Sequence, residues 1–259
     1  MPHVILKRVW DYCAYSKKFL AFIFLLLFIS SMLQKYILTV GDVYEIYVLQ
    51  VLVAISVAGY GMVITRDRIN HGKRLPKIEI MDIIVLGIKS VIVITIYLEV
   101  QGLILDFVCS PFNFPAFDLE EMLLLWPETI HMIYTHNPVN TIIFLVVGAV
   151  LFYVFSFFME IGLAKLADTN SFLEAFNFPS IKRSIDVIGW RNYAKEYTLI
   201  ILTIVLLSYL TAFQTSFTFV DSLIDMTLSF FIFATQFLGI GAVYCRIKDL
   251  ENEENMPAE

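Results

Sequence analysis

Acidic and amide side chains inside long apolar runs are the residues of this chain best suited to chemistry. Glu99 lies near the middle of one such run, and Gln101 follows two residues later. A carboxyl group at that depth is costly in lipid and usually faces protein or water. We expect either a proton or cation site at Glu99, or a protonated acid that bonds to an amide on a neighbouring helix, Gln214 or Gln236.

A second acid, Glu160, falls near the end of another apolar run. Lys165 follows five residues later and could reach towards it. An acid and a base close to the end of an apolar helix are typical of the membrane interface, where long side chains extend to water. We therefore expect Glu160 to be an interface charge and not a site.

Recognisable catalytic motifs are absent from the sequence. It contains no GxSxG, HExxH, P-loop or dinucleotide-binding glycine motif. His131 and His136 are five residues apart with no cysteine nearby, which is a weak metal signal. We therefore expect no catalytic residue, cofactor or metal, and the short basic segments predict no nucleic-acid binding. Membrane enzymes need not carry these motifs, so enzyme activity is disfavoured but stays open.

Composition indicates an integral membrane protein. Hydrophobic residues make up 59% of the 259 residues and charged residues 16%, and the mean hydropathy is +0.77. A soluble domain usually carries about 25% charged residues. A soluble core could not hide this much apolar surface, whereas lipid can solvate it.

Six apolar runs are each long enough to cross a membrane, which takes about 20 residues of helix. Only helices satisfy every backbone polar group within such a run. We expect an all-α fold in which residues 1–250 form one membrane domain of six spans. The runs are Phe19–Leu38, Ile46–Ile64, Ile88–Phe107, Ile142–Leu163, Thr198–Phe219 and Leu223–Tyr244.

Basic residues predict the orientation, because cytoplasmic loops carry an excess of Lys and Arg. Basic side chains gather in residues 1–18, 65–82 and 164–197 and again at Arg246 and Lys248, whereas residues 106–141 contain none. This alternation agrees with six spans in the cell (plasma) membrane and with both termini in the cytoplasm.

Two segments outside the spans have unusual composition. Residues 108–140 are acidic and rich in aromatic side chains, so we expect an extracytoplasmic cap on the bundle, with a lid for a ligand or partner as the alternative. Residues 251–259 are an acidic tail that we expect to be disordered.

An internal repeat links the second and sixth runs. Gly59–Arg66 and Gly239–Arg246 share the pattern G-x-G-x-V-x-x-R. Three parallel copies would fit, over 1–66, 75–166 and 176–247, each an amphipathic segment followed by a hairpin of two spans. The pairs Gly59 with Gly61 and Gly239 with Gly241 are predicted to let helices approach closely, with a substrate path as the alternative.

The amphipathic segments are predicted from helical spacing. Ile181, Ile185 and Ile188 fall on one face of a helix, and a similar apolar face recurs after Pro76. We expect cytoplasmic helices that lie in the headgroup layer. The alternative is that both segments are the ends of long, tilted spans. The residues of the second segment are Ile78, Met81, Ile84 and Val85.

Two sets of short motifs resemble a known family, the archaeal integral membrane proteins grouped as domain of unknown function 4013. The resemblance implies a multi-helix membrane fold and supplies no assigned active residue. The first set is Gly59-Tyr60, Arg66, Ile69-Asn70, Gly72, Leu75-Pro76, Gly87-Ile88-Lys89 and Tyr97-Leu98. The second is Ala175-Phe176-Asn177-Phe178, Ile188-Gly189-Trp190 and Tyr193.

The sequence supports only a ranking of three candidate functions. A non-enzymatic membrane scaffold, assembly or accessory component comes first, with the lipid bilayer and a membrane-protein partner or a second copy of the chain as its partners. A small-solute or ion- or proton-coupled transporter that uses Glu99 comes second. A lipid-modifying enzyme comes third, because it would need polar groups that converge at headgroup level.

Overall fold

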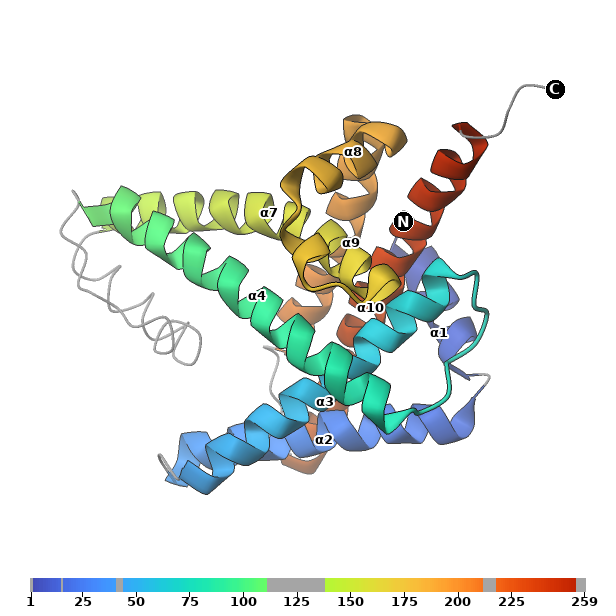
Figure 1. Cartoon of the computed structure of the whole chain (residues 1–259). Coiled ribbons are helices and arrows are strands. Elements are labelled where there is room, and N and C mark those ends of the chain that lie inside the picture. The colour runs from blue at the N-terminus through green and yellow to red at the C-terminus, as the bar shows by residue number, and fades with distance from the viewer. Residues whose placement is uncertain (1, 15, 41–43, 111–137, 212–217, 255–259) are drawn as a thin grey trace. The chain divides into compact units, whose positions relative to one another are not determined.

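The structure is a computed structural model, and every regular element in its described residues is a helix (Figure 1). It describes residues 2–14, 16–40, 44–110, 138–211 and 218–254. The predicted all-α class is confirmed. The chain divides into two units, which we describe separately: unit 1 is Met1–Val93 with Glu160–Glu259, and unit 2 is Ile94–Met159.

The described helices follow one another along the chain. They are α1 (Pro2–Ala14), α2 (Lys17–Val40), α3 (Tyr44–Ile69), α4 (Ile80–Cys109), α7 (Pro138–Thr169), the 3-10 turn η2 (Leu173–Phe176), α8 (Phe178–Ile188), α9 (Trp190–Thr211) and α10 (Thr218–Glu254). Five of them, α3, α4, α7, α9 and α10, are long and apolar enough to cross a membrane. This fits a multi-pass membrane protein. The remaining predicted span, Phe19–Leu38, lies within α2, which is not among these five, so the count of six stays a prediction.

α4 and α10 extend beyond the predicted spans into segments for which we expected a different structure. α4 begins at Ile80, so Met81, Ile84 and Val85 belong to its first turns and not to a separate interfacial helix. The reason is that no proline lies between Pro76 and Pro111, so a helix that begins after Pro76 continues into the span. α10 continues to Glu254, so residues 251–254 of the acidic tail are helical in the structure. Residues 255–259, and 111–137 of the acidic aromatic loop, lie outside the described residues.

α8 is a separate short helix, with a signal at each end. The Asn177 side chain caps its N-terminus, and Gly189, at φ 83°, ends it in a conformation that favours glycine. Ile181, Ile185 and Ile188 are all buried, because α8 packs against α9 and α10. The apolar face that we expected to rest on lipid therefore packs against protein.

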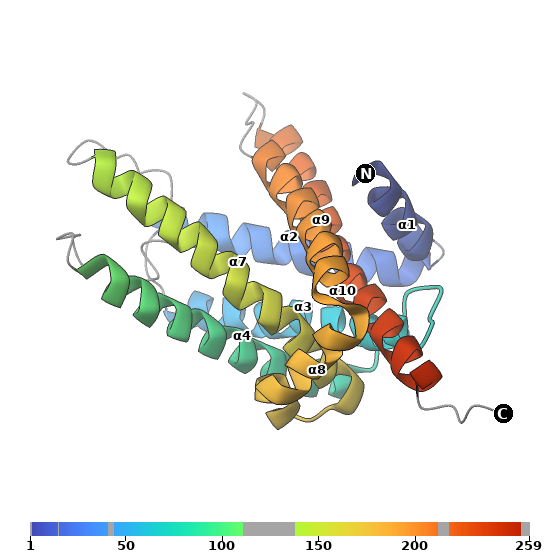
Figure 2. The same cartoon turned by 90° about the horizontal axis from the view of Figure 1, so that it is seen from above.

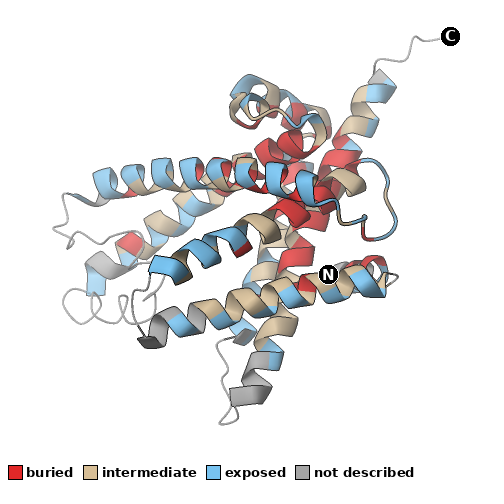
Figure 3. Ribbon diagram, turned by 60° about the horizontal axis from the view of Figure 1, so that its bottom comes forward, coloured by how far each residue is buried: buried red, intermediate tan, exposed pale blue. Residues whose placement is uncertain are grey.

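Parallel packing of α3 against α10 forms the centre of unit 1. Gly61 faces Phe237, and one turn further along both helices Gly241 faces Thr65. The Thr65 hydroxyl also donates a hydrogen bond to the Phe237 carbonyl oxygen at 3.0 Å. Seven consecutive residues of α3, from Gly59 to Thr65, are buried, and buried residues are red in Figure 3.

The other helices of unit 1 lie around this pair. α9 packs along α10, and the two lie side by side in Figure 2 as in Figure 1. α1 lies beside the C-terminal end of α3, where the Tyr12 hydroxyl donates to Asp67 at 2.6 Å. α2 starts at the same end, since Phe22 packs edge-on against Tyr60 with ring centroids 5.5 Å apart.

Unit 2 contains the later part of α4 and the earlier part of α7. Leu105 and Phe144 are buried against each other, with Val147 and Leu151 packed partly against them. Gly148 has room for a larger side chain, because a Cβ built there would make only an ordinary van der Waals contact with the Leu105 side chain, at 3.9 Å.

Candidate functional sites

The predicted intramembrane site at Glu99 falls in unit 2. Glu99 is exposed on α4, and Gln101 is half-buried on the same helix. Gln214 lies outside the described residues. Gln236 lies in unit 1, where its Nε2 donates a hydrogen bond to Oε1 of Glu160 at 3.4 Å. One predicted partner of Glu99 therefore bonds to a different carboxyl group.

Glu160 is buried and incompletely satisfied. It is only 6% exposed, and its Oε2 has no hydrogen-bond partner among the described residues. It borders a cavity of about 10 Å³ that is also lined by Tyr193 and Tyr197, which is roughly room for one water molecule. A polar atom buried without a partner is uncommon, and such atoms often mark a functional or hydrated position.

The expectation that Glu160 is an interface charge near Lys165 was wrong. The Lys165 ammonium group donates to the Ser180 hydroxyl at 2.9 Å and lies 5.7 Å from the Tyr244 ring centroid. Five residues turn an α-helix by about 140°, so the two side chains leave α7 on different faces. Their separation along the helix can be read from the sequence, but the faces that α8 and α10 cover cannot.

A much larger pocket opens in unit 1 between α1, the end of α3, α9 and α10; we name it the α1–α10 pocket. Its volume is about 690 Å³, within the range of small-molecule sites. Its polar wall consists of Asp11, Tyr12, Arg68, Lys73, Glu196 and Arg246. Its other wall residues are Val9, Leu199, Ile200, Thr235, Leu238, Gly239, Ala242 and Val243.

The pocket changes from polar to apolar along its length. Arg246 on α10 pairs with Glu196 on α9, and the wall residues that precede Arg246 on α10 are apolar as far back as Thr235. Thr235 is fully buried, and its hydroxyl has no hydrogen-bond partner among the described residues. A ligand with a charged head and an apolar body would match both ends of this pocket.

The charged end of the pocket is mildly cationic. Three cationic side chains outnumber two carboxylates there, and the Arg246–Glu196 ion pair accounts for one of each. Arg68 also donates to the Gly72 carbonyl oxygen at 3.1 Å. Burial and the hydrogen bond to Asp67 raise the pKa of Tyr12 above its ordinary value, so this phenol stays neutral.

The four predicted packing glycines all lie at contacts between helices of unit 1. A Cβ on Gly59 would collide with backbone, whereas a Cβ on Gly239 would meet a side-chain atom at 2.8 Å. Close approach of this kind is the usual role of small residues between membrane helices. The facing residues are Ile83 for Gly59, Phe237 for Gly61, Ile200 for Gly239, and Thr65 and Arg68 for Gly241.

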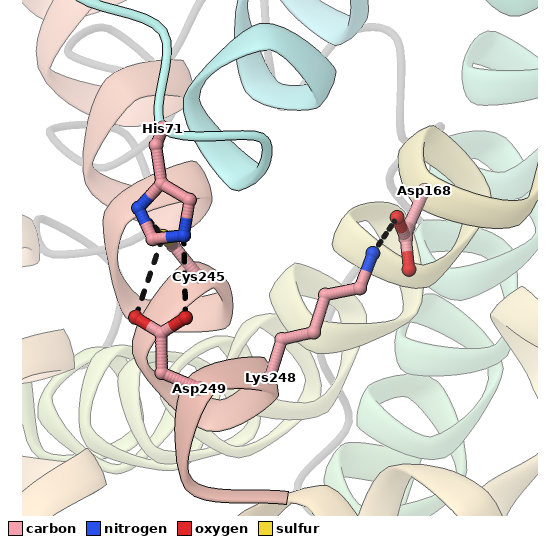
Figure 4. Close-up of polar contacts among 5 residues, drawn as sticks. All are labelled: His71, Asp168, Cys245, Lys248 and Asp249. Atoms are coloured by element: carbon pink, nitrogen blue, oxygen red, sulfur yellow. Dashed lines mark hydrogen bonds and ion pairs between the residues drawn. The ribbon is translucent and has the colours of Figure 1, made fainter. Parts of the chain in front are cut away.

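A third group of polar side chains comprises His71, Cys245 and Asp249 (Figure 4). His71 follows α3, while Cys245 and Asp249 lie one turn apart on α10. Sequence reasoning missed this group because 174 residues separate His71 from Cys245. The only signal in the sequence was the spacing of four residues between Cys245 and Asp249, which puts them on one helical face.

Comparison with known proteins identifies the family. A model of the family described as "Protein of unknown function (DUF4013)" matches residues 45–220. This chain belongs to the DUF4013 family. No curated protein and no solved structure matches it. The DUF4013 match includes His71 and Glu160 but ends before Gln236, Cys245 and Asp249 on α10.

Proposed function

We propose that this DUF4013 protein is a six-span, non-enzymatic accessory component of the cell membrane that holds a phosphate-bearing lipid in the α1–α10 pocket. The observation that carries the proposal is a pocket of about 690 Å³ with a cationic polar end and an apolar body. As an accessory component it acts with a membrane-protein partner or with a second copy of itself.

The dimensions of the pocket suit a lipid. Its wall on α10 runs from Thr235 to Arg246, and eleven residues of helix rise about 16 Å. Half of the hydrocarbon core is about 15 Å thick. The pocket would therefore accept a headgroup beside Arg68 and Lys73 and the first half of an acyl or isoprenoid chain.

Contacts within unit 1 support six spans with both termini in the cytoplasm. α1 bonds to the end of α3 through Tyr12 and Asp67, so α2 must run back along α3 to reach the beginning of that helix. α2 has 24 residues, which rise about 36 Å and exceed the hydrocarbon core of about 30 Å. The parallel packing of α3 and α10 agrees with the three-hairpin repeat, in which both helices run towards the cytoplasm.

The test is the lipid that co-purifies with variants of the pocket. Lys73→Gln removes a cation from the polar end, and Ala242→Phe fills the apolar body. Lys182→Gln on α8 is the matched control for charge, and Val205→Phe on exposed α9 surface is the control for size.

Mass spectrometry of the native protein and of its extracted lipids would measure occupancy. A charge-assisted contact is worth about 1.5–3 kcal/mol, so we expect retained phospholipid to fall about tenfold or more in both pocket variants and to persist in both controls. Equal retention by all four folded variants would refute the lipid site. Lipid that carries no phosphate would refute the assigned headgroup.

Proton- or cation-coupled transport is the second candidate, and Glu160 favours it. This acid is buried in a candidate membrane span with one oxygen unpartnered, whereas Glu99 is exposed on α4. Small thiol reagents applied to Glu160→Cys and Glu99→Cys, in a background without native cysteines, would test both acids. Labelling of position 160 from one side of the membrane supports a hydrated path, and a protected position 160 in the folded protein removes this candidate.

A further inference from the structure

The side chains of His71, Cys245 and Asp249 form a compact set of metal-binding atoms. One ring nitrogen, one sulfur and one carboxylate oxygen all lie within 4.8 Å of one another. Thiolate, imidazole and carboxylate are the three ligand types that proteins use for zinc. We propose that these residues bind a single divalent ion of the zinc class, with water in a fourth position.

The separations between donor atoms are close to those of a tetrahedral site. Nε2 of His71 lies 3.3 Å from Oδ1 of Asp249 and 4.0 Å from Sγ of Cys245. The same sulfur lies 4.0 Å from Oδ2 of Asp249. Zinc–ligand bonds of about 2.0–2.3 Å at tetrahedral angles place donors roughly 3.3–3.6 Å apart. The two distances to Asp249 end on different carboxylate oxygens, and one donor atom from each residue lies within 4.8 Å of the others. An ion bound through a single oxygen therefore needs shifts of up to roughly 1.5 Å.

Two elements hold the donors in place. Cys245 and Asp249 lie one turn apart on α10, so their side chains project from the same face. His71 has φ 59° in the turn that ends α3, and Gly72 closes that turn by donating its N–H to the Asp67 carbonyl oxygen at 2.8 Å. A Cβ on Gly72 would collide with the Asp67 carboxylate, so the turn depends on this glycine.

The surroundings leave the donors available to an ion. Lys248, the neighbour of Asp249, points away and pairs with Asp168 at 2.6 Å (Figure 4). The His71 side chain is 68% exposed and that of Asp249 is 49% exposed, which provides an entry path and access for a fourth, water ligand. Cys245 itself is buried and would lose its thiol proton to solvent as its sulfur binds the ion.

The position along α10 places the site beyond the hydrocarbon. The candidate span Leu223–Glu253 has 31 residues, whereas about 20 are enough to cross. Cys245 and Asp249 are in its last ten residues, at the end where basic residues predict the cytoplasm. The ion would tie the turn after α3, which carries Arg68 and Lys73, to the end of α10.

The test uses Co²⁺ as a spectroscopic substitute for Zn²⁺ on the full-length protein in detergent, purified without a polyhistidine tag. We expect saturable binding at one ion per chain, with visible bands of tetrahedral cobalt and near-ultraviolet thiolate-to-cobalt charge transfer. Added Zn²⁺ should displace the cobalt and abolish both signals.

Substitution of single residues would show which side chains bind the ion. Cys245→Ser should remove the charge-transfer band, and His71→Asn, which keeps a residue that tolerates positive φ, should weaken binding at least tenfold. Cys13→Ser is the matched control, because Cys13 is the other buried cysteine in the described residues, and it should bind like the parent. Binding that is unchanged in Cys245→Ser, or no stoichiometric binding by the folded parent protein, would overturn the proposal.

Discussion

At the scale of single residues, Gly59 is a position with no room for an added methyl group. A Cβ there would collide with the Ile83 carbonyl oxygen of α4, which is backbone and cannot rotate away. Overpacking of this kind costs about 1–3 kcal/mol. We expect Gly59→Ala to lower the free energy of unfolding in detergent by that amount, as measured by titration with sodium dodecyl sulfate.

Gly148 is the matched control for this substitution. It is also in a long apolar helix, but a Cβ there meets only one side-chain atom, at 3.9 Å. Alanine is a better helix former than glycine by about 1 kcal/mol. Gly148→Ala should therefore leave stability unchanged or raise it, and an equal loss in both variants would contradict a specific contact at Gly59.

Cys13 on α1 gives a prediction about pH. Burial raises the pKa of its thiol from 9.0 to about 12, so the folded protein keeps the thiol neutral where the unfolded chain ionises it. The stability that this burial contributes is fully present below pH 9 and is lost as the pH rises from 9 towards 12.

Alkylation kinetics would measure the protection of Cys13. In a background of Cys109→Ser and Cys245→Ser, we expect slow reaction with a maleimide at pH 8 in the folded protein and rapid reaction after denaturation, because the thiolate is the reactive form. Rapid labelling of the folded protein at that pH would show that α1 does not bury this side chain.

At the scale of helices, Thr65 joins α3 to α10. Its side chain is buried, and its hydroxyl lies 3.0 Å from the Phe237 carbonyl oxygen of α10 and 3.1 Å from the Gly61 carbonyl oxygen of its own helix. Interhelical hydrogen bonds in membrane proteins contribute about 0.6 kcal/mol on average. Thr65→Val keeps the shape and should lower the free energy of unfolding by about 0.5–1.5 kcal/mol.

Thr203→Val is the control for Thr65→Val. Thr203 is equally buried, but its hydroxyl donates within its own helix, to the Leu199 carbonyl oxygen at 2.8 Å. Its removal should change stability by less than the Thr65 substitution does. The opposite order in denaturant unfolding would count against α3 and α10 as the central pair.

A structural feature could be predicted from the sequence when it depends on residues that are close together in the chain. α8 was predictable, since Ile181, Ile185 and Ile188 share one helical face and Gly189 marks its end. Continuous apolar runs likewise predicted the long helices. The segment that packs against a given helix face could not be predicted. The apolar face of α8 packs against protein, and the Glu160 side chain turns towards Gln236. Such outcomes depend on contacts between distant segments, which spacing along one helix does not contain.

The site residues illustrate the same limit. Glu99 was prominent because it interrupts an apolar run, and depth within a run is a local property. The His71, Cys245 and Asp249 group depends on the packing of α3 beside α10, so no short motif could reveal it. The Gly59–Arg66 and Gly239–Arg246 repeat was visible, but the role of each glycine required knowledge of the facing residue.

At the scale of the whole molecule, the open question is whether α2 crosses the membrane. The five candidate spans alone would put the N- and C-termini on opposite sides. Six spans put them on the same side. The bond between Tyr12 and Asp67 favours six, because it holds α1 at the end of α3 and leaves α2 to run the full length back.

Reporter fusions at each terminus decide between these arrangements. A fluorescent protein that matures only in the cytoplasm should fluoresce at both ends, whereas a periplasm-type alkaline phosphatase should be active at neither. Both reporters inserted in the 111–137 segment should give the reverse pattern, since that segment contains no Lys or Arg and non-basic loops are translocated. Fluorescence at the C-terminus with phosphatase activity at the N-terminus would mean that α2 does not cross. The basic residues of segment 1–18 would then lie outside, against the charge rule that predicted the orientation.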